Sequence, residues 1–307
     1  MALAPSAGAF ELALPLRCTL GQDCYIQQYL DHDPGPGARD FTCGTLAYDG
    51  HEGTDFAVPT DAAMQAGVAV LAAAPGVVRG VRDGMPDIRV SDPGAPALAG
   101  RDCGNGVAIT HEGGWETQYC HMKQGSVLVK PGQRVETGTE LGLVGLSGRT
   151  EFPHLHLTLR RDGAMVDPFA PDDLATCGSG TAGLWAGGIA HQPGGRIAAG
   201  FAATIPDYAT VRAGTVPPPD AQAPALVFWL HLYGVQAGDR LELALTGPEG
   251  ALAGQQITLD RTQAQTFRAL GKRLSAARWP AGAYTAQYAL LRDGKPVTTG
   301  RETLTLP

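Results

Sequence analysis

The sequence lacks any hydrophobic run long enough to span a bilayer, so no membrane-spanning helix is expected. It also lacks an excess of positive charge. With 23 Lys and Arg against 30 Asp and Glu, the formal net charge is −7, which argues against a nucleic-acid-binding protein. The start of the chain lacks the basic residues and uninterrupted apolar core of a signal peptide. We expect a protein that works in the periplasm or outside the cell, with Met1 standing where a signal has been removed.

Helical periodicity is also missing from the central region, and charged residues make up only 17% of the chain. Glycine (42) and proline (23) are abundant, a mix that favours strands, turns and loops over long helices. The 307 residues favour two domains rather than one. We therefore predict a mainly β protein, with a compact antiparallel β domain followed by a C-terminal, immunoglobulin-like β-sandwich.

Changes in composition along the chain predict four parts. The N-terminal part holds three cysteines and a turn-rich run, and the third part is rich in Gly, Ala and Pro and ends in a proline run. The expected parts are 1–45 as a disulfide-rich extension, 46–175 as the first β domain, 176–215 as a linker region and 216–307 as the β-sandwich.

Alternating and apolar segments predict individual strands within these parts. Residues 106–110 and 115–119 flank a Gly-containing turn and predict a β-hairpin. Further strands are expected at 127–129 and, inside the linker region, around 210–212. The apolar segment 226–233 is long enough to be a central strand with both faces covered.

The six cysteines include no CxxC pair, which argues against a four-thiolate zinc site. An even number in a loop-rich chain predicts disulfides and an oxidising compartment. Cys103 and Cys120 flank the predicted hairpin on opposite strands, so their Cα atoms can fall within bridging distance. The other four cysteines would then pair in one of three connectivities. These cysteines are Cys18, Cys24, Cys43 and Cys177.

Two short patterns carry residues that bind metals. His51 and Asp55 are four positions apart, and His154 and His156 are two apart. Residues two apart on a strand point to one face, so both histidines can reach one site, and Gly53 would let the backbone bend between His51 and Asp55. Imidazole and carboxylate are zinc ligands, and three protein ligands plus a water are typical of a catalytic site. The remaining histidines would be free for proton transfer and oxyanion stabilisation.

The order of several motifs resembles the lysostaphin-type, or LytM-type, zinc endopeptidases (M23 peptidases). The similarity covers roughly residues 46–170. The matching segments are 51–56 (HEGTDF), 104–111 (GNGVAITH), 116–122 (ETQYCHM), 135–138 (VETG), 145–148 (GLSG), 154–157 (HLHL) and 161–168 (RDGAMVDP). Cys120 departs from the family, which usually has a small residue there.

The resemblance implies one zinc ion per chain, with His51, Asp55 and His156 as ligands and His121 and His154 as catalytic histidines. It implies hydrolysis of peptide cross-links in bacterial peptidoglycan, with a zinc-bound water as nucleophile. The partners would be peptidoglycan stem peptides, with a wall or protein contact through the C-terminal domain. The alternative is a LytM-like binding protein or activator of cell-wall amidases that has no catalytic activity.

Several residues have weaker signals. Tyr119 lies two positions before His121 and would share its face, and Arg149 and Thr150 precede His154 in a loop, so these three are candidate substrate contacts. For Tyr119, packing in the core is an equal alternative. Residues 31–33 (DHD) are expected to form a solvated loop, although they could bind a metal. His111 is expected at the surface. The segment 129–138 resembles hairpins of lipoyl-carrier domains, but no lysine occupies an exposed hairpin tip, and that function would leave the histidines unexplained.

Overall fold

The computed structural model describes residues 10–178 and 183–307, and the chain divides into two compact units. The described residues of the first unit fall within Met1–Arg17, Gln28–Phe56 and Val68–His191. Those of the second unit fall within Cys18–Gln27, Ala57–Gly67 and Gln192–Pro307. In these described ranges, no helix is long and apolar enough to cross a membrane.

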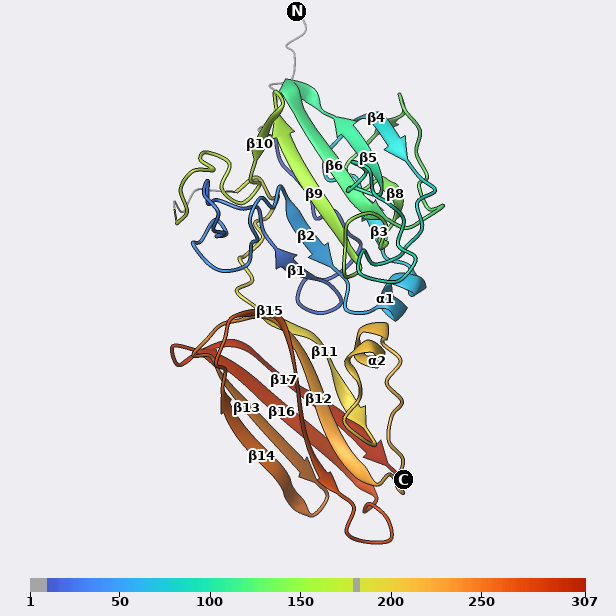
Figure 1. Ribbon diagram of the computed structural model, residues 1–307, viewed down its shortest axis with the longest axis vertical. Coiled ribbons are helices and arrows are strands. Elements are labelled where there is room, and N and C mark those ends of the chain that lie inside the picture. Colours follow the sequence, from blue (N-terminus) through green and yellow to red (C-terminus); the bar gives the residue numbers. More distant parts are fainter. Residues whose placement is uncertain (1–9, 179–182) are drawn as a thin grey trace, which may run out of the picture. The chain divides into compact units, whose positions relative to one another are not determined.

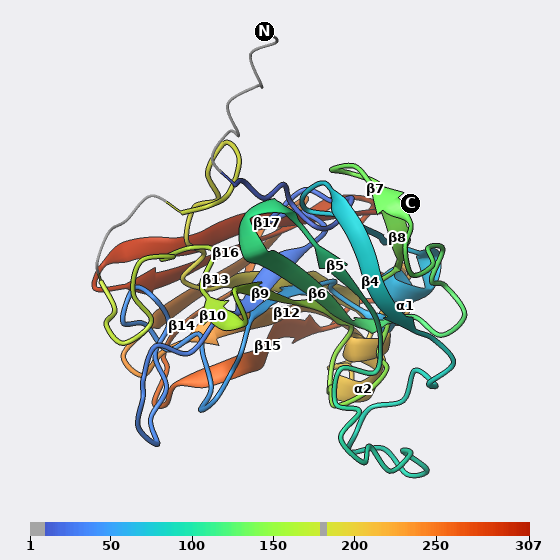
Figure 2. The ribbon, with the colours of Figure 1, turned by 90° about the horizontal axis from the view of Figure 1, so that it is seen from above.

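Short antiparallel strands make up most of the first unit. From β2 onward its main sheet has the order β2-β9-β6-β5-β4-β7, with β10 paired to β9, and β3 pairs separately with β8 (Figures 1 and 2). The bounds are β2 (Thr54–Ala57), β3 (Ala69–Leu71), β4 (Gly76–Arg82), β5 (Asn105–Thr110), the 3-10 turn η1 (Glu112–Gly114), β6 (Trp115–Met122), β7 (Arg134–Val135), β8 (Glu140–Leu143), β9 (His154–Arg161) and β10 (Ala164–Val166).

Alternation along β9 explains how the sheet separates core from site. Leu155, Leu157 and Leu159 are at most 1% exposed and face the core. The residues between them, including His154 and His156, point to the opposite face because successive side chains of a strand alternate. The predicted hairpin is confirmed as β5 and β6.

Two predicted strands are wrong. Residues 127–129 form no strand, since the Val127 N–H is bound by the Asp83 carboxylate and Leu128 is 64% exposed. Residues 210–212 lie in helix α2 (Tyr208–Ala213). Asp207 caps that helix by accepting from the Thr210 N–H, and Gly214 ends it with left-handed backbone, a pair of signals that outweighs the β-branched residues between them.

The second unit contains two antiparallel sheets, of order β11-β12-β15 and β14-β13-β16-β17. Its apolar core joins both sheets, for example through Phe228 of β12, Leu243 of β13 and Tyr288 of β16. As predicted, β12 is central in its sheet and almost wholly buried. The bounds are β1 (Tyr25–Gln28), α1 (Asp61–Ala66), β11 (Gly195–Ala202), β12 (Ala225–Val235), β13 (Arg240–Gly247), β14 (Gly250–Thr258), β15 (Gln263–Arg273), β16 (Gly282–Arg292) and β17 (Lys295–Leu306).

Segments from early in the chain belong to this second unit. The Tyr25 ring lies 4.6 Å from the ring of Tyr233, and the Gln27 amide donates to the Ala264 carbonyl at 3.1 Å. Strand β11 and helix α2 both come from residues 176–215, the expected linker region. The second unit is therefore assembled from separate stretches of chain, which contiguous boundaries drawn from composition do not anticipate.

All six cysteines form disulfides, as the even count predicts. The expected Cys103–Cys120 bridge is confirmed, and of the three connectivities left open for the others the structure has Cys18–Cys24 and Cys43–Cys177. The Cys43–Cys177 bridge ties the two ends of the first unit across a sequence separation of 134. Loops that strand pairing alone would leave free are thereby held in place.

Candidate functional site

His51, Asp55 and His156 meet at the junction of β2 and β9. His51 lies just before β2, Asp55 is its second residue, and His156 is the third residue of β9, the neighbouring strand. The His51 Nε2 atom is 3.1 Å from both Asp55 Oδ1 and His156 Nδ1, and these last two atoms are 2.8 Å apart. His51 and Asp55 are buried, and the His156 side chain is 14% exposed. Three potential ligand atoms thus face one small space that reaches solvent.

Hydrogen bonds behind the rings indicate which nitrogens carry hydrogen. His51 Nδ1 lies 2.6 Å from the Tyr29 carbonyl oxygen, which can only accept, so Nδ1 donates and Nε2 presents a lone pair. His156 Nε2 lies 3.0 Å from Thr158 Oγ1, a hydroxyl that can accept from it, and in that tautomer Nδ1 presents a lone pair. Two imidazole lone pairs and a carboxylate oxygen of Asp55 therefore converge. Such an arrangement is repulsive unless a cation or a proton lies between them.

Gly53 makes this convergence possible by close approach. A Cβ at this position would lie 2.5 Å from the Leu157 carbonyl oxygen and 2.7 Å from His156 Nε2. Any side chain would push the segment carrying His51 and Asp55 away from β9. The expected bend is present at Gly53, but its φ is not positive, so the close approach of β9 rather than left-handed backbone requires the glycine.

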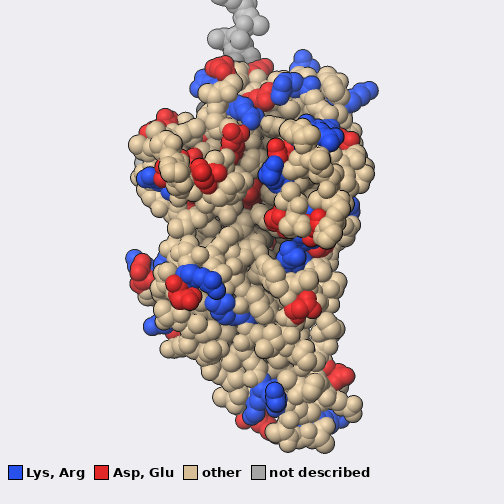
Figure 3. All heavy atoms as spheres, in the orientation of Figure 1, with Lys and Arg blue, Asp and Glu red and all other residues tan. Residues whose placement is uncertain are grey.

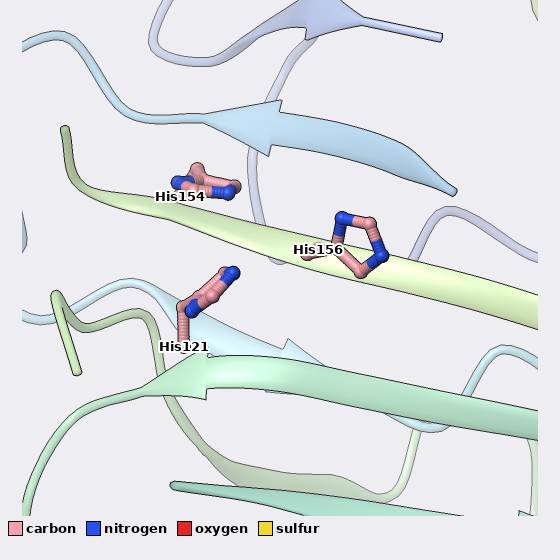
Figure 4. Close-up of side chains that lie close together, drawn as sticks. All are labelled: His121, His154 and His156. Atoms are coloured by element: carbon pink, nitrogen blue, oxygen red, sulfur yellow. The ribbon is translucent and has the colours of Figure 1, made fainter. Parts of the chain in front are cut away.

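His121 and His154 enter the same space from β6 and β9 (Figure 4). Their ring centroids are 4.7 Å apart, and His154 Nε2 lies 3.4 Å from Asp55 Oδ1. The Nδ1 atom of His121 donates to the Ser147 carbonyl at 2.8 Å, and that of His154 donates to the Phe152 carbonyl at 2.9 Å. Both rings therefore present an unprotonated Nε2 when neutral.

The backbone of His121 is held in an unusual conformation. Its φ of 62° lies in the left-handed region, which residues other than glycine rarely adopt. The His121 N–H donates to the Cys103 carbonyl at 2.8 Å, and the adjacent Cys120 is bonded to Cys103. On the other side, the Asn105 amide donates to the Met122 carbonyl at 3.2 Å. These contacts flank the histidine and stabilise a backbone that the strand alone would not adopt.

The electrostatics of the cluster centre on the buried carboxylate. Burial alone would raise the pKa of Asp55, but His51 and His154 outweigh it and hold that pKa well below its usual range. Burial, together with repulsion from His154 and His156, holds the pKa of His121 well below 6.5. Burial also lowers the pKa of His156. Near neutral pH, Asp55 is therefore an anion and His121 a neutral proton acceptor.

The most compact set of ligand atoms fits a tetrahedral metal ion. Ligand atoms at about 2.0–2.1 Å from zinc lie about 3.3 Å apart in a tetrahedron. The separations of 2.8–3.1 Å among His51, Asp55 and His156 are within about half an ångström of this value. A second group, His121, His154 and His156, has nitrogens within 4.8 Å of one another but includes no anion. The set containing Asp55 offers a divalent cation the better electrostatic environment.

The three candidate substrate contacts, Tyr119, Arg149 and Thr150, lie in different environments. Tyr119 is fully buried, and its hydroxyl accepts from the Ala73 N–H at 2.8 Å, so its side chain faces the core and the expected substrate contact is wrong. The irregular backbone at His121 breaks the two-residue alternation on which that expectation depended. Thr150 is 5% exposed and lies 3.1 Å from His154 Nδ1, which places it behind the histidine. Arg149 is exposed and pairs with Asp102, and its substrate contact stays a prediction.

Residues 31–33 do not form the expected solvated loop at His32. Its side chain is fully buried, with Nε2 2.8 Å from Asp167 Oδ2 and Nδ1 2.9 Å from the Thr176 carbonyl. Both partners accept, so His32 carries hydrogen on both nitrogens. Burial alone would lower its pKa, but the hydrogen bonds to Asp167 and Thr176 and the nearby carboxylates together outweigh burial and raise that pKa. His111 is not a surface residue either, since it is half-buried and its nitrogens contact the Pro75 carbonyl and Thr117 Oγ1.

Several residues of the site carry no recognisable signal in the sequence. Tyr29 orients His51 through a main-chain carbonyl, and such contacts leave no trace in side-chain type. Ser147 accepts from the Asn105 N–H through its hydroxyl while its carbonyl orients His121. The Tyr48 ring packs 4.4 Å from His51 with the side chain 52% exposed. Its position three residues before a histidine ligand candidate was the only available clue.

Positive and negative side chains are mixed on the visible surface of the described residues. On the face of the molecule in Figure 3, lysine and arginine side chains of the described residues are interspersed with aspartate and glutamate rather than gathered in one patch. This distribution agrees with the net charge of −7 and with the expectation against nucleic-acid binding.

Comparison with known proteins places the histidine cluster in a family. The model of peptidase family M23 matches residues 49–168. The chain is 37% identical over 117 residues to the peptidoglycan DD-endopeptidase ShyA of Vibrio cholerae, covering 38% of this chain and 22% of that protein. It is 37% identical over 95 residues to the cell division protein DipM of Caulobacter vibrioides, covering 30% of this chain and 15% of that protein.

Among solved structures, a mutant catalytic domain of the prophage-encoded M23 protein EnpA from Enterococcus faecalis is similar, with a TM-score of 0.35 and 26% identity. The match covers 52% of this chain and 96% of that domain. This chain spans less than a quarter of the length of the two curated relatives. The matched range contains all five residues of the cluster, and residues 49–168 are therefore a domain of peptidase family M23.

Proposed function

We propose that this protein is a zinc metalloendopeptidase that hydrolyses peptide cross-links of bacterial peptidoglycan. The observation that carries the proposal is the convergence of two imidazole nitrogens and a carboxylate oxygen within 3.1 Å of one another. Two further histidines, His121 and His154, lie beside this group, and neither is needed as a ligand. A site with ligands and separate proton-transfer groups suits metal-assisted hydrolysis better than structural metal binding.

His51 Nε2, Asp55 Oδ1 and His156 Nδ1 would hold one zinc ion per chain. A zinc ion bound there would supply an acidified water and a Lewis acid for the scissile carbonyl. The Tyr29 carbonyl holds His51 in the tautomer that such a site requires, and the Thr158 hydroxyl can accept from His156 Nε2 to support the same tautomer there.

His121 and His154 supply the proton transfers in this proposal. The lowered pKa of His121 keeps its Nε2 unprotonated, so it can accept a proton from the attacking water. His121 would then return this proton to the leaving amine, and His154, held at Nδ1 by the Phe152 carbonyl, would stabilise the oxyanion through its Nε2–H when the ring is protonated. These roles are assigned from position, since His121 in β6 and His154 in β9 lie beside the three proposed ligands.

The substrate and the compartment are inferred from relatives and from cysteine chemistry. One relative, similar over 117 residues, is named a peptidoglycan DD-endopeptidase. Three disulfides support a location in an oxidising compartment, such as the periplasm or the exterior, where peptidoglycan is accessible.

Metal analysis of three variants tests the ligand assignment. His51→Ala and Asp55→Ala should lose zinc, because each removes one of three ligands, whereas His121→Ala should keep about one zinc per chain and lose turnover. Elemental analysis and isothermal titration of zinc give a readout that does not depend on activity. Normal zinc content in the His51→Ala protein would remove His51 from the ligand set.

Digestion of purified sacculi tests the reaction. Release of uncross-linked muropeptides by the wild type, and none by His121→Ala, is the expected result. Release of sugar fragments with intact peptides would reject the peptidase assignment. A protein that binds zinc, cleaves nothing and stimulates a cell-wall amidase would establish the alternative, a binding or activator protein.

The second unit is proposed to contact the wall or a partner protein. A groove of about 820 Å³ lies on its four-stranded sheet, lined by polar side chains that include Glu242, Gln287 and Arg301. Truncation cannot test this role cleanly, because residues 18–27 and 57–67 are part of the same unit. Full-length Gln287→Ala/Arg301→Ala should bind sacculi less well and cleave soluble cross-linked muropeptides normally. Unchanged sacculus binding would contradict the role of this groove.

A further inference from the structure

A groove outside the histidine cluster opens on the β4–β5 side of the first unit. Its volume is about 240 Å³, and it is lined by β4 residues 79–82, by residues 103–104 and 106–108 and by Gln118 of β6. Two glycines form its floor. A Cβ at Gly104 would lie 2.4 Å from the Ser147 carbonyl, and one at Gly106 would lie 2.2 Å from the Tyr119 carbonyl, so crowding by the backbone keeps this floor free of side chains.

Strand register connects this groove to the histidine cluster. Arg82 pairs with Gly106, and Cys120 pairs with His156. The bulge between Asn105 and Val107 leaves Gly106 opposite Cys120 and the residue after it. Arg82, Gly106, Cys120 and His156 thus form one row across four strands. Side chains of paired residues share a face of a sheet, so the groove and the cluster lie on the same face.

The row also sets a distance along a bound peptide. Adjacent strands lie about 4.8 Å apart, so three steps place the Arg82 Cα roughly 14 Å from that of His156. An extended peptide rises about 3.4 Å per residue, so it would cover this distance with about four residues. The Cys103–Cys120 bridge lies in the row between the two ends and leaves no long side chain there.

Arg82 differs from Arg79 because its charge is not neutralised by a carboxylate in the part of the chain that the structure describes. Arg79 binds both carboxylate oxygens of Glu116, at 2.9 and 3.0 Å. Arg82 is exposed and donates once, to the Gly104 carbonyl at 3.1 Å. Within the described residues, none of the ion pairs involves Arg82. Its guanidinium therefore keeps most of its five donors in a geometry that matches a carboxylate.

We propose that this groove binds a carboxylate of the cross-linked peptide, about four residues from the scissile bond, with Arg82 as the residue that selects for it. The inference rests on the proposed function and adds a substrate class to it: peptides with a free carboxylate at this position rather than its amide. Arg82 would act on binding and not on the chemical step, because its Cα lies roughly 14 Å from that of His156.

A matched pair of synthetic cross-linked peptides tests the assignment, one with the carboxylate free and one with it amidated. The wild type should have a KM about tenfold lower for the free acid, the low end for a charge-assisted hydrogen bond at an exposed site. Arg82→Gln should raise the KM for the acid about tenfold and leave that for the amide and both kcat values unchanged. Arg17→Gln is the control, since Arg17 is also exposed and pairs with Glu140.

The outcomes separate this inference from the proposed function. If the wild type cleaves both peptides and Arg82→Gln retains the preference for the acid, the assignment of Arg82 is overturned and the peptidase stands. If the wild type cleaves neither, the peptidase fails, and calorimetric binding of the same two peptides decides the groove. Tighter binding of the acid that Arg82→Gln abolishes would support the groove, and equal binding of acid and amide would overturn it.

Discussion

Removal of the Cys103–Cys120 disulfide is the most informative perturbation of the catalytic geometry. The bridge closes a loop with a sequence separation of 17, for which the chain-entropy relation gives about 3 kcal/mol of stability. His121 directly follows Cys120, has a φ of 62° and donates its N–H to the Cys103 carbonyl. Without the covalent link, nothing but hydrogen bonds would hold this left-handed backbone against its preference for ordinary strand geometry.

The double variant Cys103→Ala/Cys120→Ala should therefore lose both stability and rate. We expect the free energy of unfolding to fall by about 3 kcal/mol, measured by denaturant titration. We expect kcat on soluble cross-linked muropeptides to fall about 10- to 100-fold, because displacement of a catalytic group by about 1 Å has an effect of this order. The zinc content should stay at one per chain, since neither cysteine nor His121 is among the proposed ligands.

The matched control is Cys18→Ala/Cys24→Ala, in the second unit. That bridge has a sequence separation of 6, and the same relation gives about 2 kcal/mol for its loss. Its kcat should be that of the wild type. A Cys103→Ala/Cys120→Ala protein that loses stability but turns over at the normal rate would refute the reasoning, because it would show that His121 keeps its position without the bridge.

Three further perturbations have defined outcomes. Gly53→Ala should cost about 1–3 kcal/mol and weaken zinc binding measured by calorimetry, because its Cβ would meet the Leu157 carbonyl at 2.5 Å, and unchanged zinc affinity would contradict this. Thr150→Val removes the hydroxyl 3.1 Å from His154 Nδ1 and should lower kcat severalfold with zinc retained, whereas a change in KM alone would favour a substrate contact. Burial lowers the pKa of His231 from 6.5 to about 4, so neutral His231 stabilises the second unit above pH 6.5. That contribution, at most about 3 kcal/mol, is lost as pH falls from 6.5 to 4, and His231→Gln should flatten the pH dependence of unfolding in this window.

The sequence alone was sufficient for features that depend on local pattern. Alternation and turn residues predicted the β5–β6 hairpin and the central apolar strand β12. The same hairpin brought Cys103 and Cys120 within bridging distance, because residues on paired strands are neighbours. The spacing of His154 and His156 placed both on one face of β9, since side-chain direction in a strand depends only on position.

Tertiary structure decided what depends on contacts between distant segments. Tyr119 faces the core rather than the cleft, a choice that the sequence left open, because the positive φ at His121 breaks the alternation that would put both side chains on one face. Gly53 is required by the approach of β9, which lies a hundred positions later in the chain. Main-chain carbonyls of Tyr29 and Ser147 orient the histidines, and a carbonyl has the same chemistry in every residue type. Residue identity can therefore indicate which groups bind and react, but only the folded chain determines which lone pairs meet.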